Sequence, residues 1–171
     1  MNNLNLVLPE IFISISIMFL LVLGVFKKDS SKLIFNISLI VLFITLIITF
    51  NETFAINRKT LFNDSVVIDY MSSLMKIITL IATFLVLVIS SSYLKTTKIF
   101  KIEYPILILS SVLGMLIMIS SNDLIVFYMG LELQSLALYV LATFNRDQLK
   151  SSEAGLKYFV LSALSSGLLL Y

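Results

Sequence analysis

The chain of 171 residues contains no cysteine, no histidine and no tryptophan. The absence of cysteine excludes disulfide bonds, thiolate metal sites and cysteine-ligated iron–sulfur clusters. The absence of histidine removes the commonest metal ligand and the side chain that most readily exchanges a proton near neutral pH. Any proton chemistry in this chain must therefore use carboxylates, lysines, tyrosines and water.

Charged side chains are also scarce, because they make up 13% of the residues while hydrophobic residues make up 59% and the mean hydropathy is +1.06. A soluble domain of this length does not need so much apolar surface. Apolar runs of about 17 to 25 residues, long enough to cross a bilayer, recur along the chain. The predicted spans are residues 4–26, 33–50, 70–92, 102–120, 124–144 and 154–171. They are too continuously apolar for barrel strands, so the sequence predicts an all-α membrane protein, a polytopic bundle of transmembrane helices.

The connections and the chain ends indicate a single bundle. The longest connection, 51–69, has the length and mixed polarity of an ordinary extramembrane loop. The first span lacks a basic leader and a small-residue cleavage site, so we interpret it as a retained helix. After the sixth span the sequence stops at "LSALSSGLLLY" without a polar cap or basic anchor. We therefore expect the chain to be the N-terminal part of a longer protein.

Basic residues are distributed unevenly between the two sets of connections. Those in the odd-numbered connections are Lys27, Lys28, Lys32, Lys95, Lys98, Lys101, Arg146 and Lys150. The opposite side has Arg58 and Lys59. Because lysine and arginine in short loops favour the cytoplasmic side, the sequence predicts odd connections in the cytoplasm or matrix and an N-terminus outside.

Glu132 is the charged residue whose position in the predicted spans most needs an explanation. It lies in "NDLIVFYMGLELQSLALYVLATF", Asn122 to Phe144, about 12 Å along a helix from Leu124 at about 1.5 Å per residue. A carboxylate at that depth costs about 2.5 to 3.5 kcal/mol on an insertion scale. Its side chain is too short to reach either surface, which favours a functional role.

Two spans also carry polar stripes, each within an arc of about 80° at helical periodicity. The stripe of the fifth span contains Tyr128, Glu132, Ser135, Tyr139 and Thr143. The stripe of the third span contains Asp69, Ser72, Lys76, Thr79, Thr83 and Ser90. Because lipid offers such side chains no partner, we expect the stripes to face each other or a file of water. A carboxylate and lysines arranged in this way predict a proton relay.

Simpler interpretations remain open for individual residues. Glu10 follows Pro9 and suits the first turn of a helix near the outer surface. Lys76 could snorkel to a surface, and Lys157 could either snorkel or pair with Glu153, four residues earlier. Serine and tyrosine in helices more often bond a neighbour or the preceding turn than conduct protons.

Three segments carry a resemblance to a known family: "LPEIFI" at Leu8–Ile13, "GMLIMISSNDLIVFYMGLELQSLALYVLA" at Gly114–Ala142 and "SSEAGLKYFVLSALSSGLLLY" at Ser151–Tyr171. They resemble the first half of the antiporter-like subunit N family of respiratory complex I, NADH:quinone oxidoreductase, and its mitochondrial counterpart. The similarity is nearly continuous through the fifth and sixth spans, whereas the second span and residues 51–69 match only in character. It implies an antiporter-like fold with about fourteen membrane helices and two inverted repeats that contain broken helices.

The resemblance also implies roles for particular residues. Glu132 would be the family's glutamate on the fifth helix, and Lys157 the lysine of its "EAGLKY" motif. Lys76 joins them as a candidate on the proton pathway. The family's central lysine lies on a later helix, beyond Tyr171, so no complete proton path can be drawn from this chain.

The expected function is that of a proton-translocating membrane-arm subunit. The chain has no glycine-rich dinucleotide loop and no P-loop, so we expect neither a cofactor nor a metal here, with NADH, FMN, iron–sulfur clusters and quinone in partner subunits. The expected partners are other membrane-arm subunits and the lipid bilayer, not nucleic acid. The expected location is a bacterial or mitochondrial inner membrane. The alternatives are a subunit of a cation/proton antiporter, and an assembly or scaffold protein in which Glu132 only specifies helix packing.

Overall fold

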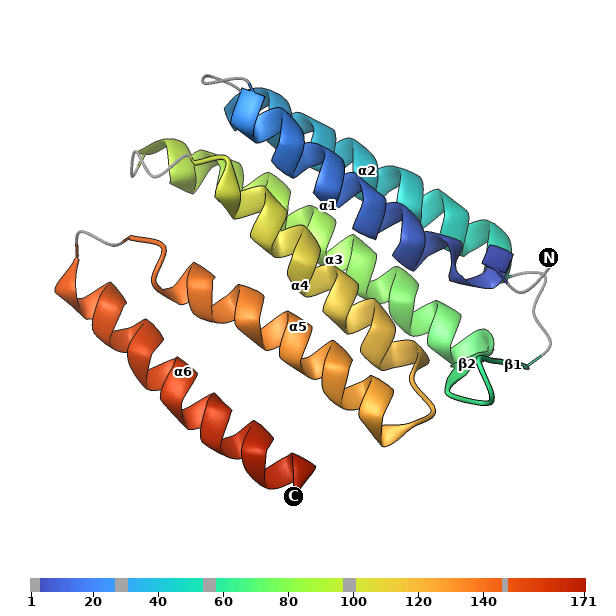
Figure 1. Ribbon diagram of the computed structural model, residues 1–171. Coiled ribbons are helices and arrows are strands. Elements are labelled where there is room, and N and C mark those ends of the chain that lie inside the picture. Colours follow the sequence, from blue (N-terminus) through green and yellow to red (C-terminus); the bar gives the residue numbers. More distant parts are fainter. Residues whose placement is uncertain (1–3, 27–30, 54–57, 97–100, 146–147) are drawn as a thin grey trace.

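A computed structural model describes residues 4–26, 31–53, 58–96, 101–145 and 148–171. Within these ranges the chain forms six α-helices, which confirms the predicted all-α class, and one short hairpin (Figure 1). The helices are α1 (Leu8–Phe26), α2 (Ser31–Thr53), α3 (Tyr70–Thr96), α4 (Glu103–Ser120), α5 (Leu124–Ala142) and α6 (Leu149–Leu170). A 3-10 turn, η1 (Leu4–Val7), precedes α1, and the hairpin strands are β1 (Lys59–Leu61) and β2 (Val66–Ile68).

The helices form because each apolar segment can bond all of its backbone groups internally, as lipid requires. Both prolines of the chain, Pro9 and Pro105, lie in the first turn of a helix, where a missing N–H does no harm. By length and composition, five described helices, α1 to α5, could cross a membrane. Helix α6 is not among them, since Glu153 and Lys157 make its first half less apolar. A sixth membrane span stays a prediction.

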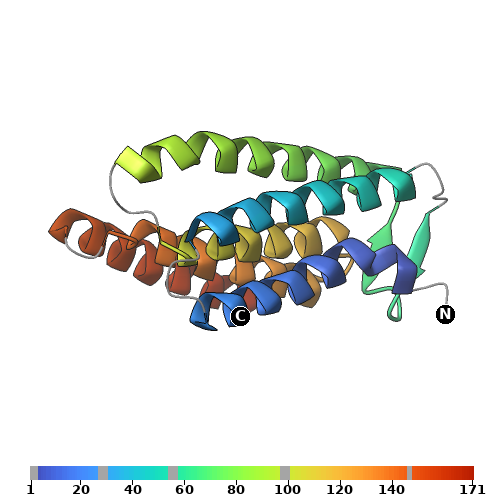
Figure 2. The same cartoon turned by 90° about the horizontal axis from the view of Figure 1, so that it is seen from above.

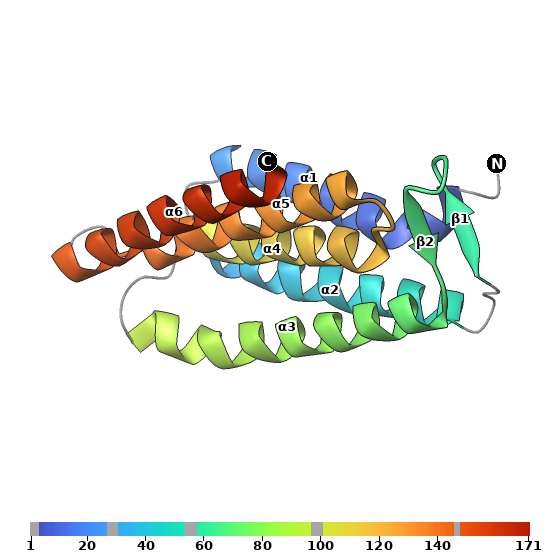
Figure 3. The same cartoon turned by 90° about the horizontal axis from the view of Figure 1, so that it is seen from below.

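Helix α4 lies at the centre of the bundle. It packs against α1, α2, α3 and α5, and Leu109, Val112 and Leu116 on it are fully buried. Figure 3 shows α4 between α3 and α5, and Figure 1 shows α6 at the edge of the bundle beside α5. Helix α6 exposes most of its apolar side chains.

Two glycines allow α4 and α5 to touch. A Cβ atom on Gly114 would lie 2.7 Å from the carbonyl oxygen of Gly130 and 2.6 Å from the backbone nitrogen of Gln134. A Cβ atom on Gly130 would lie 2.9 Å from the carbonyl oxygen of Gly114. Small residues at such crossings bring backbones into contact, so any larger side chain would push the two helices apart.

The connection between α2 and α3 is partly ordered as a hairpin, which the sequence prediction of an ordinary loop did not include. Strand β1 pairs antiparallel with β2, and the turn between them has positive φ values of 54° at Phe62, 53° at Asn63 and 65° at Asp64. The hairpin also bonds to the α4–α5 turn, because the Asn122 N–H donates to the Ser65 carbonyl at 2.9 Å. This contact with a distant turn stabilises the three-residue strands. A local sequence pattern does not reveal such a contact.

The two ends of the bundle differ in charge. Lys32, Lys95, Lys101 and Lys150 lie at or next to the helix ends opposite the hairpin (Figure 2). Arg58 and Lys59 lie at the hairpin end. The remaining basic residues of the predicted charge bias, Lys27, Lys28, Lys98 and Arg146, lie outside the described residues. The orientation of the N-terminus stays a prediction.

Candidate functional site

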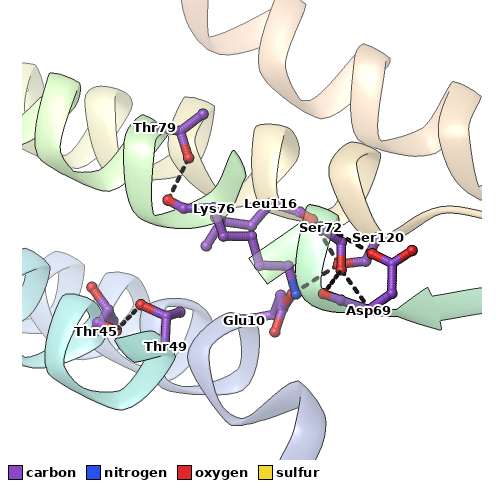
Figure 4. Close-up of polar contacts among 9 residues, drawn as sticks. All are labelled: Glu10, Thr45, Thr49, Asp69, Ser72, Lys76, Thr79, Leu116 and Ser120. Atoms are coloured by element: carbon purple, nitrogen blue, oxygen red, sulfur yellow. Dashed lines mark hydrogen bonds and ion pairs between the residues drawn. The ribbon is translucent and has the colours of Figure 1, made fainter. Parts of the chain in front are cut away.

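Lys76 and Glu10 form a buried ion pair at the hairpin end of the bundle. The Nζ atom of Lys76, on α3, lies 2.5 Å from Oε1 of Glu10, on α1 (Figure 4). The two side chains are 3% and 7% exposed. Desolvated charges of this kind are stable only when paired. Lys76 therefore does not snorkel to a surface, and Glu10 is more than the exposed first-turn carboxylate that its position after Pro9 suggested.

One hydroxyl group contacts the pair, and a helix cap lies next to it along α3. The Ser120 hydroxyl, at the end of α4, lies 3.4 Å from Glu10 Oε1 and 3.2 Å from the Leu116 carbonyl oxygen. At the start of α3, the Ser72 N–H donates to Asp69 Oδ1 at 2.7 Å while the Asp69 N–H donates to the Ser72 hydroxyl at 2.9 Å. This reciprocal arrangement caps the helix. It fixes the first turn of α3, and Lys76 projects from the next turn.

The rest of the third-span stripe bonds to its own helix. The Thr79 hydroxyl donates to the Lys76 carbonyl at 2.8 Å, and the Thr83 hydroxyl to the Thr79 carbonyl at 2.9 Å. The Ser90 hydroxyl donates to the Leu87 carbonyl at 2.9 Å. These are ordinary bonds to the preceding turn. They do not form a side-chain relay along α3.

The two polar stripes do not face each other. Helix α3 packs against α2 and α4, and α4 lies between α3 and α5 (Figure 3). The expectation that the stripes meet is therefore wrong, while the alternative of a water file stays a prediction. Helical periodicity determines which residues share a face, but the packing order of the helices determines what that face meets.

Glu132 lies half-buried on α5. Its carbonyl accepts a bond from the Ser135 hydroxyl at 3.0 Å. Among the described residues its carboxylate has no ion-pair partner, because Lys76 pairs with Glu10 and Lys157 with Glu153. The structure therefore does not bring together Glu132, Lys76 and Lys157, the three residues that the sequence suggested as a proton pathway.

Lys157 lies on the outer face of α6. Its Nζ atom is 2.6 Å from Glu153 Oε1, and the two side chains are 68% and 63% exposed. The simpler interpretation, a helical pair four residues apart, describes its position in this chain. Within the described ranges, no group of three or more carboxylates could hold a metal ion.

Tyr139, from the fifth-span stripe, joins α5 to α6. Its hydroxyl donates to the hydroxyl of Ser162. Its ring also packs edge to face against Tyr158, with centroids 4.8 Å apart, and against Phe159 at 5.6 Å. This part of the stripe has a packing role between neighbouring helices.

Sequence reasoning missed the partnership between Glu10 and Lys76, although one signal could have found it. Helices α1 and α3 begin at the same end of an alternating bundle, so residues near their starts lie at similar depths. Glu10 is in the first turn of α1, and Lys76 lies two turns into α3. Comparing the depth of each charged residue in the bundle, as well as its helix face, would have paired Glu10 with Lys76.

Comparisons with known proteins agree on one family. A family model described as "NADH:quinone oxidoreductase/Mrp antiporter, TM" matches residues 121–171. A protein of Pelagibacter ubique named NADH-quinone oxidoreductase subunit N is 68% identical over 171 residues, which are 100% of this chain and 36% of that protein. A protein of the same name from Paramagnetospirillum magneticum is 47% identical over 165 residues, 96% of this chain and 34% of that protein. The chain thus spans about a third of the length of these relatives.

The fold is also similar to a solved structure. A chain in the structure of respiratory complex I from Thermus thermophilus with bound aureothin superposes with a TM-score of 0.80 at 23% identity. The match covers 95% of this chain and 35% of that chain. At this level of identity the likeness concerns the fold, an antiporter-like arrangement of membrane helices.

Proposed function

The chain belongs to the subunit N family of NADH-quinone oxidoreductase, and from this premise we propose that it is part of a proton-translocating subunit in the membrane arm of complex I. The observation that carries the proposal is the identity, over the whole chain, with relatives of that name. A multi-pass bundle with a buried, hydrogen-bonded ion pair suits this role. Buried charges inside membrane helices mark ion and proton pathways more often than they serve packing.

The proposal assigns electron transfer to other subunits. NADH, FMN, iron–sulfur clusters and quinone would be bound there, and this chain would contribute proton transfer alone. Its partners would be other membrane-arm subunits. The curated relatives are bacterial proteins, which supports a place in the bacterial inner membrane, and the basic loop residues favour an N-terminus outside.

Within the chain, the proposed proton-pathway residues are Lys76, Glu132 and Lys157. A low-dielectric environment favours the neutral forms of amines and carboxyl groups, whereas a nearby opposite charge favours the charged forms. A change in the distance between Lys76 and Glu10 would therefore change proton affinity at this end of the bundle. Moving a proton against the membrane potential needs about 2.3 kcal/mol per 100 mV, which the redox subunits would supply.

The test uses assembled complex in inverted membrane vesicles and measures proton uptake per NADH oxidised. Lys76→Arg should keep the ion pair and assemble normally, because arginine also bonds carboxylates. Its guanidinium stays charged at any working pH, so proton uptake per NADH should fall. Thr79→Val is the matched control, since the Thr79 hydroxyl bonds only the preceding turn of α3. Normal uptake by the arginine variant would show that Lys76 does not carry protons.

A second candidate is a subunit of a cation/proton antiporter, because the matching family model is described by both names. Such a protein would exchange protons for cations without NADH. Proton release from vesicles on addition of a Na⁺ or K⁺ gradient, insensitive to NADH, would favour this candidate. The names of the curated relatives favour the first.

A further inference from the structure

Among the described residues, the carboxylate of Glu10 is hydrogen-bonded through one oxygen and unpaired at the other. Its Oε1 atom accepts from Lys76 and lies near the Ser120 hydroxyl. Its Oε2 atom is buried and accepts no hydrogen bond from the described part of the chain. A carboxylate oxygen has two lone pairs and loses considerable free energy when it is buried without a donor. Oε2 is thus the unpaired polar atom of the buried ion pair within the described ranges.

A cavity of about 320 Å³ lies beside this carboxylate, between α1, α4 and β2. Its walls are mostly apolar, with Ile11, Leu113 and Ile117 among them, but Glu10, Ser14 and Ser120 supply polar groups. A water molecule needs about 30 Å³ of liquid volume and two to four polar partners. The cavity therefore has room for water, with polar groups on its wall to bind it. Ser14 is exposed, so the cavity opens at the surface of α1.

We propose that Glu10 is a proton-exchange residue, whose carboxylate takes a proton from water that enters this cavity. This inference rests on the proposed function and adds an exchange site at the hairpin end. In the step, a hydronium ion transfers one proton to the Glu10 carboxylate and leaves a water molecule. The new O–H group neutralises Glu10, and Lys76 loses its counter-charge while still donating to Oε1.

Few other charges bear on this site. The charged group bonded to Glu10 is Lys76, and the carboxylate of Asp69 caps the start of the helix that carries Lys76. The charged residue in the first turn of α4, Glu103, lies at the far end of the bundle. The other described charges at the hairpin end are Arg58, Lys59, Asp64 and Asp123. Lys76 is therefore the charged side chain in direct contact with Glu10.

The first test uses N,N′-dicyclohexylcarbodiimide, which reacts with protonated carboxyl groups in apolar surroundings to form an N-acylurea. In the assembled complex, peptide mapping by mass spectrometry should find the adduct on Glu10. Lys76→Met should raise the modified fraction several-fold, because loss of the ammonium group favours the neutral acid. The control is Glu103, which is exposed and should stay unmodified in both proteins. An unmodified Glu10 in both proteins, or equal modification in both, would overturn the proposal.

A second test does not depend on a variant of the ion pair. The chain has no cysteine, so Ser14→Cys places one thiol in the cavity and Met18→Cys places one on the next turn of the same helix. A charged methanethiosulfonate needs water and a thiolate, so it should modify Ser14→Cys faster than Met18→Cys. A Ser14→Cys rate no higher than that of Met18→Cys would mean that the cavity gives the reagent no preferred access, and it would overturn the proposal.

Neither measurement uses proton pumping. Failure of the exchange site can therefore be distinguished from failure of the proposed function. An unreactive Glu10 would overturn the exchange site and leave the proposed function standing. Normal pumping by Lys76→Arg would count against the proposed role of Lys76, whatever the reactivity of Glu10.

Discussion

At the scale of single residues, the two ion pairs of the described chain differ in environment although their geometry is similar. Glu10 and Lys76 are almost fully desolvated, whereas Glu153 and Lys157 are about two-thirds exposed. Breaking a buried pair by removing one partner typically costs about 3 to 5 kcal/mol, because the other charge is left buried alone. An exposed pair contributes about 1 kcal/mol or less.

This difference predicts the behaviour of substitutions at the buried pair. Glu10→Leu alone should lower the temperature at which the solubilised complex loses this subunit, and adding Lys76→Leu should restore much of the loss. The measurement is native gel electrophoresis after heating, with Glu153→Gln as the exposed control that should change little. A double variant less stable than either single variant would show that the pair is itself stabilising.

Glu132 predicts a different result, because it has no ion-pair partner among the described residues. Glu132→Ala should leave assembly unharmed, since no charge is stranded, yet it should lower proton uptake per NADH if the carboxylate lies on the pathway. Glu132→Asp, which keeps the charge, should retain part of the activity. A Glu132→Ala complex that pumps like the parent would exclude this carboxylate from the relay. A variant that fails to assemble would favour the scaffold alternative.

At the scale of the helices, the crossing of α4 and α5 depends on two glycines. A methyl group on Gly130 would lie within 2.9 Å of backbone atoms of Gly114 and Met118. Backbone cannot move aside as a flexible side chain can, so α4 and α5 would have to separate. Since α4 contacts most of the other helices, the disturbance would extend to the core.

Gly130→Ala should therefore reduce the amount of assembled complex, as measured by native gel and immunoblot. Gly167→Ala on α6 is the matched control, because a Cβ atom there meets nothing within 4 Å. On propensity alone the control should be neutral or stabilising by up to about 1 kcal/mol. Equal assembly of the two variants would mean that the contact between α4 and α5 tolerates a wider spacing.

At the scale of the whole molecule, the loop charges predict orientation. Cysteine substitutions at Asn51 and Lys98 should react with a membrane-impermeant maleimide from opposite sides, with Asn51 outside, because each is the single thiol of this chain. The comparison of intact cells with inverted vesicles gives the side for each. Labelling of both from one side would contradict the alternating arrangement of helices that the charge bias predicts.

The sequence by itself determined the class of protein and the position of nearly every helix. Long apolar runs, prolines at helix starts and the pair Glu153–Lys157 are local features, readable within a few residues. The similarity around Glu132 and Lys157 also identified the family before the comparisons confirmed it. Of the third-span stripe, Ser72 to Ser90 lie on α3 and Asp69 caps that helix.

Only the tertiary structure decided which faces meet. Glu10 and Lys76 are 66 residues apart in the chain. The hairpin likewise forms backbone hydrogen bonds with the distant turn between α4 and α5. Hydropathy and periodicity describe one helix at a time, whereas an ion pair between helices depends on their packing order, rotation and depth. Because α4 lies between α3 and α5, Lys76 is partnered by the carboxylate of α1 and not by that of α5.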